Sequence, residues 1–335
     1  MLEIFSEYGL FLLKVITILI SFIVLISFVA ASKKNSNQEG LDVENLNKKY
    51  KGLSDSLNKV VLQKDEWKAK QKNDKAIQKN QKKQKKRKPK AYVLDFLGDI
   101  KASAVPSLRE EVTAILDVAK KNDQIILRLD NHGGVVHEHG LAASQLARIR
   151  QKKINLVVVV DKVAASGGYL MACVANKIYA APFAILGSIG VIAQLPNFNR
   201  LLDNYGVDFE QVTAGQYKRN VTMFGKNTDE DREKLKEQLE EIHSLFKSSV
   251  NEYRPELNLD KVATGEYWYG KRALELGLID EIKTSDELLL EMSKKYEIFS
   301  VKLKIKQPLK KRIMSGVDSL LGKFEDIRWS KNFEN

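Results

Sequence analysis

The order of hydrophobic and polar positions predicts a membrane anchor at the start of the chain. From residue 9 to residue 31 the sequence is predominantly apolar and Lys14 is its single charge, and residues 1–8 precede this run. A helix of this length rises about 34 Å, and a bilayer core is about 30 Å thick. A cleaved signal peptide is the alternative, because VAAS at 29–32 resembles a cleavage site. Acidic residues before the run and its length favour an uncleaved single-pass anchor.

A polar tether is predicted over residues 32–90. Its first half carries apolar residues at helical spacing, which predicts a short amphipathic helix that docks on the body or self-associates; these are Val43, Leu46, Tyr50, Leu53, Leu57 and Val60. Residues 68–90 are rich in lysine and glutamine. Such a self-repelling tract predicts a flexible segment or a patch that touches anionic lipid head groups.

Strands alternate with helices in the body of the protein, residues 91–295. Apolar runs predict strands at 91–98, 124–130 and 154–161, and two amphipathic stretches between them predict helices. This order indicates an α/β fold with a mainly parallel sheet. In such sheets functional sites collect at the carboxyl ends of the strands, where two glycine pairs fall: Gly133-Gly134 and Gly167-Gly168.

Further helices are predicted towards the C-terminus. The longest covers 228–253, with Thr228 as its cap, and shorter helices cover 270–278 and 284–296. The remaining residues, 296–335, form a separate C-terminal part. Within it we expect an edge strand at 301–306 and an amphipathic helix at 313–329.

The location of the positive charge, and not its total, bears on the function. The formal charge is +12, and residues 33–90 hold 19 lysines or arginines against seven acids, so the rest of the chain is neutral. A nucleic-acid-binding domain carries its charge on a folded surface, so we expect no nucleic-acid partner. Cys173 is the only cysteine, which excludes an intramolecular disulfide, and its apolar surroundings predict a core residue.

Ser166 has the setting of a nucleophile. It stands where a predicted strand gives way to a helix, and Gly167 leaves its N–H accessible at the positive end of that helix. The other glycine pair can offer a second donor to an oxyanion. A serine in this position can also be only a helix cap, so the arrangement outlines an acyl-transfer site without proving one.

Histidines do not supply an evident base. His132, His137 and His139 crowd the second glycine loop, where we expect hydrogen bonding instead of metal binding, and His243 lies in the long polar helix. A Ser-His-Asp triad is not excluded by chain order. The nucleophile motif G-x-S-x-G is absent from the sequence, which disfavours an α/β-hydrolase.

Three motifs together resemble the signal peptide peptidase A family of membrane serine peptidases. They are AASGGY at 164–169, GSIGVI at 187–192 and TAGQYKR at 213–219. The resemblance implies a Ser-Lys dyad, with Ser166 as nucleophile, Lys218 as general base and Ser188 orienting the lysine. It implies oxyanion donors at Gly167 and in the glycine loop, where we favour Gly134 over Gly133.

The resemblance also implies a fold like that of the ClpP and crotonase group, assembly into homo-oligomeric rings, and no cofactor or metal. Expected partners are membrane lipid and membrane-associated or signal-peptide-derived peptides. The expected location is the bacterial inner membrane, with the side that the body faces left open. One departure concerns the turn before the glycine pair, where related sequences have Ser-Pro and this chain has Asn131-His132. Without the proline we expect a looser turn.

A lysine base requires particular surroundings. An exposed lysine is almost wholly protonated at neutral pH, so Lys218 can act as a base only in a closed, dry site, which subunit packing could provide. Two other functions remain open. One is a crotonase-like acyl-CoA enzyme, and the other is an inactive scaffold that binds peptides.

Overall fold

A computed structural model describes residues 8–22, 40–83, 88–215 and 217–304 of the protein. The chain divides into two compact units, residues 42–302 and the remainder. In the second of these, residues 8–22 form a helix with exposed side chains. Within the described ranges, no helix has both the length and the apolar character needed to cross a bilayer. The predicted anchor extends into residues 23–31, and the predicted C-terminal helix at 313–329 likewise lies outside the described residues.

A ten-stranded sheet forms the centre of the larger unit. Its main path runs in the order β1 (Gly40–Asn45), β10 (Glu297–Lys304), β2 (Lys90–Gly98), β3 (Gln124–Asn131), β4 (Asn155–Val160), β6 (Lys177–Ala180) and β9 (Glu281–Ile282). From β10 to β9 every pairing is parallel. The predicted α/β fold with a mainly parallel sheet is therefore confirmed.

Three short strands branch from the end of β3. β5 (Val163–Ala165) pairs in parallel with β3 and with β7 (Ile185–Gly187), and β7 pairs antiparallel with β8 (Tyr267–Tyr269). Because β5 continues from the carboxyl end of β4, this branch lies at the edge of the sheet where the parallel strands end. Both glycine pairs follow strands at that edge.

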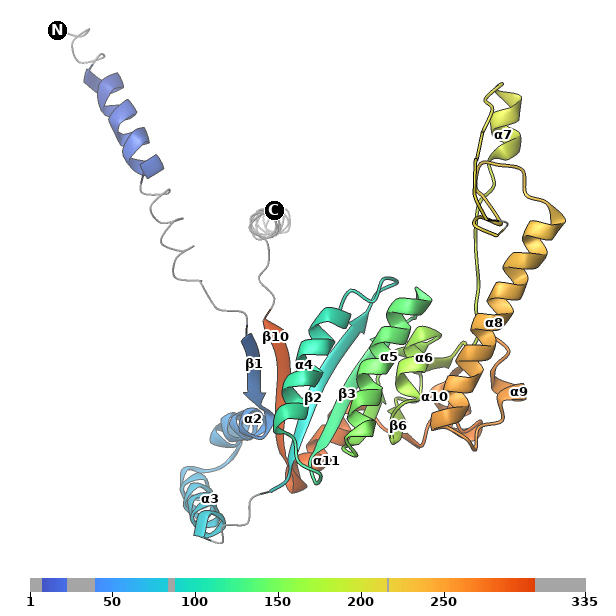
Figure 1. The fold of residues 1–335 in the computed structure, drawn as a ribbon. Helices are drawn as coiled ribbons and strands as arrows, with labels where there is room; N and C mark the ends of the chain where they lie inside the picture. The colour runs from blue at the N-terminus through green and yellow to red at the C-terminus, as the bar shows by residue number, and fades with distance from the viewer. Residues whose placement is uncertain (1–7, 23–39, 84–87, 216, 305–335) are drawn as a thin grey trace, which may run out of the picture. The chain divides into compact units, whose positions relative to one another are not determined.

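Helices cover both faces of the sheet (Figure 1). On one face α4 (Val105–Val118), α5 (Val136–Gln151) and α6 (Gly167–Ala172) enclose the larger apolar core. On the other face α2 (Leu46–Val61) and α11 (Ser285–Lys295) cover a smaller core that includes Leu46 and Leu289. The strands between these layers are apolar on both sides, as expected for buried parallel strands.

Two predictions near the tether and the C-terminus differ from the structure. Residues 64–83, where composition predicted flexibility beyond residue 68, form helix α3 (Lys64–Lys83). Lysine, glutamine and alanine are good helix formers, which explains the difference. The strand predicted at 301–306 is not an edge strand, because β10 lies between β1 and β2. The amphipathic helix is α2, but only its first turns pack on the sheet, and Leu53, Leu57 and Val60 are exposed.

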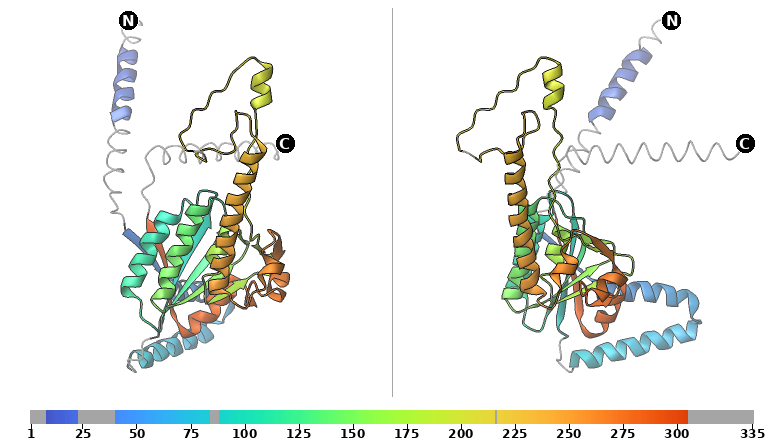
Figure 2. Two further views of the ribbon diagram at one scale, coloured as in Figure 1. Left: turned by 45° about the vertical axis from the view of Figure 1, so that its right-hand side comes forward. Right: turned by 90° about the vertical axis from the view of Figure 1, so that its right-hand side faces the viewer.

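A long arm projects from the body between β7 and α8 (Asp229–Tyr253). It covers residues 191–228 and contains one short helix, α7 (Asn199–Asn204). Figure 2 shows α7 and its flanking loops beyond the N-terminal end of α8, away from the sheet. Helix α8 begins at Thr228 with a capping box in which Thr228 and Asp231 exchange hydrogen bonds, as the sequence predicted for this helix start. Two further short helices, α9 (Leu259–Val262) and α10 (Gly270–Glu275), complete the fold.

Candidate active site

Ser166 occupies a strained turn between β5 and α6. Its backbone has φ 52° and ψ −121°, a conformation that side chains other than glycine rarely adopt and that costs about 1–3 kcal/mol. Two hydrogen bonds hold the turn: the Ser166 N–H donates to Gly187 O at 2.8 Å, and Leu170 N–H donates to Ser166 O at 3.0 Å. Ser166 makes no side-chain cap bond to α6, so the simple capping role is wrong. The hydroxyl is instead left half-buried at the edge of a cavity.

Gly133 packs closely against Ser166, with no room for a side chain. A Cβ on Gly133 would stand 2.7 Å from Ser166 Cβ and 2.8 Å from the Gly167 nitrogen. The same Cβ would also stand 2.8 Å from Ala165 O, so a side chain at this position would push the glycine loop away from Ser166 and the start of α6. Gly133 also has φ 87°, a second reason for glycine at this position.

The two glycines of the loop differ in what their N–H groups do. Gly133 N–H donates to Asn131 Oδ1 at 2.9 Å and is buried, whereas Gly134 is exposed and lines the cavity at Ser166. The following N–H, of Val135, donates to Ile100 O at 2.8 Å. Of these three donors, only the Gly134 N–H has no hydrogen bond within the described chain. This geometry supports Gly134 over Gly133 as the second oxyanion donor.

A largely apolar cavity of about 590 Å³ opens beside Ser166. Helices α5, α6 and α8 form its walls, with Gly134, Ser166 and Gly167 at one end and Leu170, Cys173 and Phe246 among the apolar side chains further along. Burial raises the pKa of the Cys173 thiol to about 12, which keeps it uncharged at neutral pH. Cys173 is therefore an apolar lining residue, in agreement with its predicted place in the core.

Ser188 follows the neighbouring strand in the same register as Ser166. Ala165 pairs with Gly187, so the two serines leave adjacent parallel strands side by side. Ser188 also has a positive φ of 51°, and its N–H donates to Glu266 O at 2.6 Å. The structure therefore brings Ser166, Gly167, Gly134 and Ser188 to one edge of the sheet.

Lys218 lies apart from this group. It belongs to the projecting arm, is exposed, and is not among the residues that line the cavity at Ser166. Its backbone makes a local contact, in which the Lys218 N–H donates to Gly215 O at 3.1 Å. A single chain therefore does not provide the closed surroundings expected for a lysine base.

The histidines do not provide a base for Ser166 either. His139 is fully buried and its ring nitrogens contact Val135 O at 3.0 Å and Asn131 Oδ1 at 3.2 Å, which confirms a hydrogen-bonding role. His132 and His137 are exposed, and His243 has a buried Nε2 without a partner in the described chain. Among the described residues, no group of three or more His, Cys, Asp and Glu is arranged to hold a metal.

Sequence reasoning missed Asn131, which holds the glycine turn through Gly133. A looser turn was predicted because proline is absent, but the Gly133 N–H donates to Asn131 Oδ1 and this hydrogen bond holds the turn. An asparagine two residues before a turn N–H is a known turn signal and could have indicated it. The contact of Asn131 with His139 depends on the packing of α5 and is not visible in the sequence.

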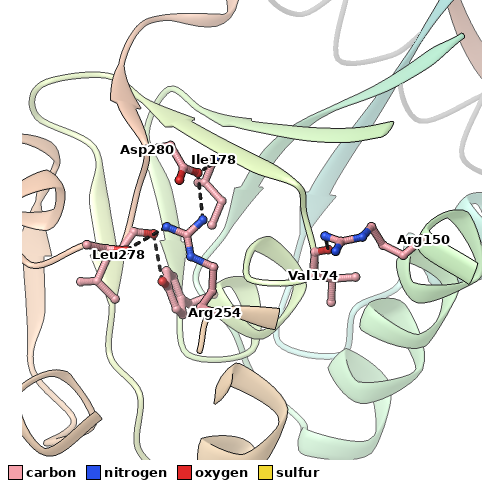
Figure 3. A network of polar contacts seen from close by, with 8 residues as sticks. Arg150, Val174, Ile178, Arg254, Leu278 and Asp280 are labelled. Atoms are coloured by element: carbon pink, nitrogen blue, oxygen red, sulfur yellow. Dashed lines mark hydrogen bonds and ion pairs between the residues drawn. The ribbon is translucent and has the colours of Figure 1, made fainter. Parts of the chain in front are cut away.

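The base of α8 is fixed to the body by a partly buried arginine (Figure 3). Arg254, the residue after α8, donates to Asp280 Oδ2 at 2.8 Å and to Gly277 O at 2.9 Å. Asp280 Oδ2 also accepts the Ile178 N–H at 2.7 Å. Nearby, Arg150 of α5 donates to Val174 O at 2.9 Å and lies over the ring of Tyr253. These contacts hold the wall of the cavity that α8 supplies.

Comparison with known proteins identifies the class. Residues 3–146 match Peptidase family S49 N-terminal, and residues 148–298 match Peptidase family S49. The chain belongs to this peptidase family. It is 45% identical to the Probable protease SohB of Haemophilus influenzae, over 92% of each chain. It is 48% identical to the Probable protease SohB of Buchnera aphidicola subsp. Schlechtendalia chinensis, over 85% of this chain and 98% of the relative.

A solved structure of a membrane-bound stomatin-specific protease with a substrate peptide is also similar. It shares 17% identity with this chain at a TM-score of 0.42, over 69% of this chain and 98% of that one.

Proposed function

We propose that the protein is a serine endopeptidase that uses a Ser-Lys dyad, with Ser166 as nucleophile and Lys218 as general base. The observation that carries this proposal is the strained turn that presents Ser166 next to Gly167, at a cavity that Gly134 also lines. Membership of a peptidase family supports peptides as the substrates.

The reaction follows from these positions. Neutral Lys218 takes the hydroxyl proton while Ser166 Oγ attacks the peptide carbonyl, and the N–H groups of Gly167 and Gly134 stabilise the oxyanion. The C–N bond then breaks, the leaving amine receives the proton from Lys218, and an acyl-enzyme remains. Water, deprotonated by the same lysine, attacks the ester and frees Ser166. Ser188, on the strand next to Ser166, orients the lysine.

We propose that the arm carries Lys218 to a second copy of the protein. Exposed apolar side chains are spaced along it, including Ile192 at 74%, Tyr205 at 79% and Val212 at 96% exposure. Apolar surface of this kind is typical of interfaces between subunits. We propose a homo-oligomeric ring in which Lys218 completes the site of a neighbouring copy, which also provides the closed surroundings that the base needs.

Substrate and location are the remaining parts of the proposal. The apolar cavity beside Ser166 fits an apolar side chain next to the bond that is cut. Membrane-associated and signal-peptide-derived peptides carry such residues. Residues 9–31 anchor the protein as a single span in the bacterial inner membrane and keep the site close to these substrates.

Two substitutions test the dyad directly. Ser166→Ala and Lys218→Ala in the full chain are expected to lower the cleavage of an apolar peptide at least about a thousandfold, without changing the circular dichroism spectrum. Lys226→Ala removes the same charge from the same exposed arm and should leave the rate unchanged. Cleavage by Lys218→Ala at the rate of Lys226→Ala would reject the lysine as the base.

A fluorophosphonate separates this function from the alternatives. Ser166 Oγ should attack its phosphorus and release fluoride, which gives a covalent adduct that mass spectrometry locates on residue 166. An acyl-CoA enzyme without a serine nucleophile, or an inactive scaffold, would stay unlabelled.

A further inference from the structure

Two fully buried polar side chains lie beneath the proposed oxyanion hole. Asn131 is the last residue of β3, and His139 lies in the second turn of α5, and both have 0% exposure. Buried polar groups are costly unless their hydrogen bonds are made, so their contacts indicate what they hold in place. Asn131 Oδ1 and His139 Nε2 are 3.2 Å apart.

Asn131 connects the glycine loop to helix α6. Its Oδ1 accepts the Gly133 N–H at 2.9 Å, and its Nδ2 donates to Met171 Sδ of α6 at 3.3 Å. Its backbone packs on the same helix, because a Cβ on Gly168 would stand 2.2 Å from Asn131 O. One side chain therefore turns the Gly133 N–H inward and sets the distance between the loop and the first turn of α6.

His139 contacts two further residues beside the proposed oxyanion hole, Val135 and Gly167. Val135 O can only accept, so the ring donates through Nδ1 to this carbonyl at 3.0 Å, directly after the Gly133-Gly134 pair. In this neutral tautomer Nε2 has no hydrogen, so its contact with Asn131 Oδ1 at 3.2 Å is one of packing and not a hydrogen bond. The ring face lies against Gly167, where a Cβ would stand 2.5 Å from His139 Cγ. His139 thus contacts the start of α6 and also the end of the glycine loop.

We propose that Asn131 and His139 act as a pair of positioning residues that hold the N–H groups of Gly134 and Gly167 at the separation an oxyanion needs. The two donors come from different elements, and the described chain places this pair between those elements. Neither side chain touches the reacting atoms. Oxyanion donors act at about 2.7–3.1 Å, so a small shift of one element against the other is costly to the rate. This inference rests on the proposed peptidase activity.

Asn131→Leu tests the first half of the pair. Leucine has a similar volume but cannot accept the Gly133 N–H, so the loop loses its tie to α6. We expect kcat and the second-order rate of Ser166 labelling by a fluorophosphonate to fall about tenfold to a hundredfold, and KM to change less than about threefold. A purely structural role would lower the melting temperature and leave the labelling rate of the folded fraction unchanged.

A matched control is available at the opposite end of the sheet. Asn176 Oδ1 accepts the Leu156 N–H at 2.9 Å, the same kind of bond at the same length. Asn176→Leu should therefore lower stability without lowering the labelling rate. Asn131→Ser keeps a shorter acceptor that can form the same turn, and its labelling rate should lie between those of Asn131→Leu and the natural protein.

His139→Leu tests the second half, and the double variant tests the pairing. Because both side chains hold the same two elements, the losses in kcat should not add: Asn131→Leu with His139→Leu should react about as slowly as the slower single variant. The inference is overturned if folded Asn131→Leu and His139→Leu both react with the fluorophosphonate at the natural rate. A natural protein that shows no labelling would instead reject the proposed function.

Discussion

Ser166 and Ser188 share an unusual backbone conformation. They follow the paired residues Ala165 and Gly187, and their φ angles of 52° and 51° are nearly equal. Strained residues persist where the surrounding structure fixes them, and they are found at functional sites more often than elsewhere. The two serines therefore leave adjacent strands side by side at one edge of the sheet, which suits the roles proposed for them.

Gly133→Ala tests the close packing of the glycine loop on Ser166. It should lower kcat/KM by at least about a hundredfold, because the new Cβ would stand 2.7 Å from Ser166 Cβ and 2.8 Å from the Gly167 nitrogen and would displace the loop from α6. A Cβ on Gly52 of α2 would have nothing within 4 Å, so Gly52→Ala should keep full activity and raise the free energy of unfolding by up to about 1 kcal/mol. Peptide hydrolysis and urea unfolding measure both effects. Full activity of Gly133→Ala would show that catalysis does not depend on this packing.

At the residue scale, the sequence indicated those candidate site residues that stand in a distinctive local pattern. Ser166 and Gly167 could be found from a strand, a serine and two glycines in succession. Lys218 could be found only through resemblance, because nothing local distinguishes it among many lysines. The contact between Asn131 and His139 could not be predicted from the sequence. Eight residues and a turn separate them along the chain, and only the packing of α5 brings them together.

Helix α8 is fixed at one end and free at the other. Its C-terminal end is held by Arg254, whose side chain is 13% exposed, and its N-terminal end carries the arm away from the sheet (Figure 2). Helix α8 therefore connects the arm to the body, and it also forms one wall of the cavity.

Two arginines at opposite ends of α8 allow a matched comparison. Arg254→Ala leaves Asp280 without its partly buried partner and should lower the free energy of unfolding by about 2–4 kcal/mol. Arg232→Ala removes an exposed pair with Asp229 and should cost less than about 1 kcal/mol. Urea denaturation followed by circular dichroism gives both values. Equal losses would show that the Arg254 network does not anchor the helix.

At the element scale, prediction succeeded where apolar pattern and caps were strong. Strands β2, β3 and β4 and helix α8 were found within a few residues, because buried runs and the Thr228 cap are local signals. Helix α3 was missed because its composition is typical of a solvated tether, although its residues favour helix. The inner place of β10 was missed because pairing with β1 joins segments about 250 residues apart.

The molecule as a whole presents an arm whose apolar side chains face water in a single chain. Val212 and Tyr205 are 96% and 79% exposed. Subunit contacts are set by surfaces of this kind and not by local sequence pattern, which is why the sequence alone left the origin of the lysine open. The proposed ring covers these residues and brings Lys218 to a neighbouring Ser166.

Val212→Asp should disrupt assembly and activity together. Sedimentation of the full chain in detergent should show a smaller species, and peptide cleavage should fall at least about tenfold, because charge is depleted at the core of subunit interfaces. Leu290→Asp makes the same change at an exposed site of α11 and should alter neither. A monomeric Val212→Asp that cleaves peptides at the natural rate would contradict the proposed assembly.

Mixing two inactive variants tests whether the lysine comes from a neighbour. When Ser166→Ala and Lys218→Ala are dissociated, combined and reassembled, some sites should pair an intact serine with an intact lysine from another copy. Part of the peptidase activity should return. If both groups came from one chain, no mixture of these variants would regain any.

The separation of the arm from the nucleophile has a consequence for when proteolysis begins. Under the proposed arrangement a newly made, solitary copy holds a serine without its base and is harmless to surrounding proteins. Turnover then depends on local density, and confinement to the plane of a bilayer raises that density far above its value in bulk solution. Dilution, for example into excess detergent, should silence the enzyme reversibly without unfolding it.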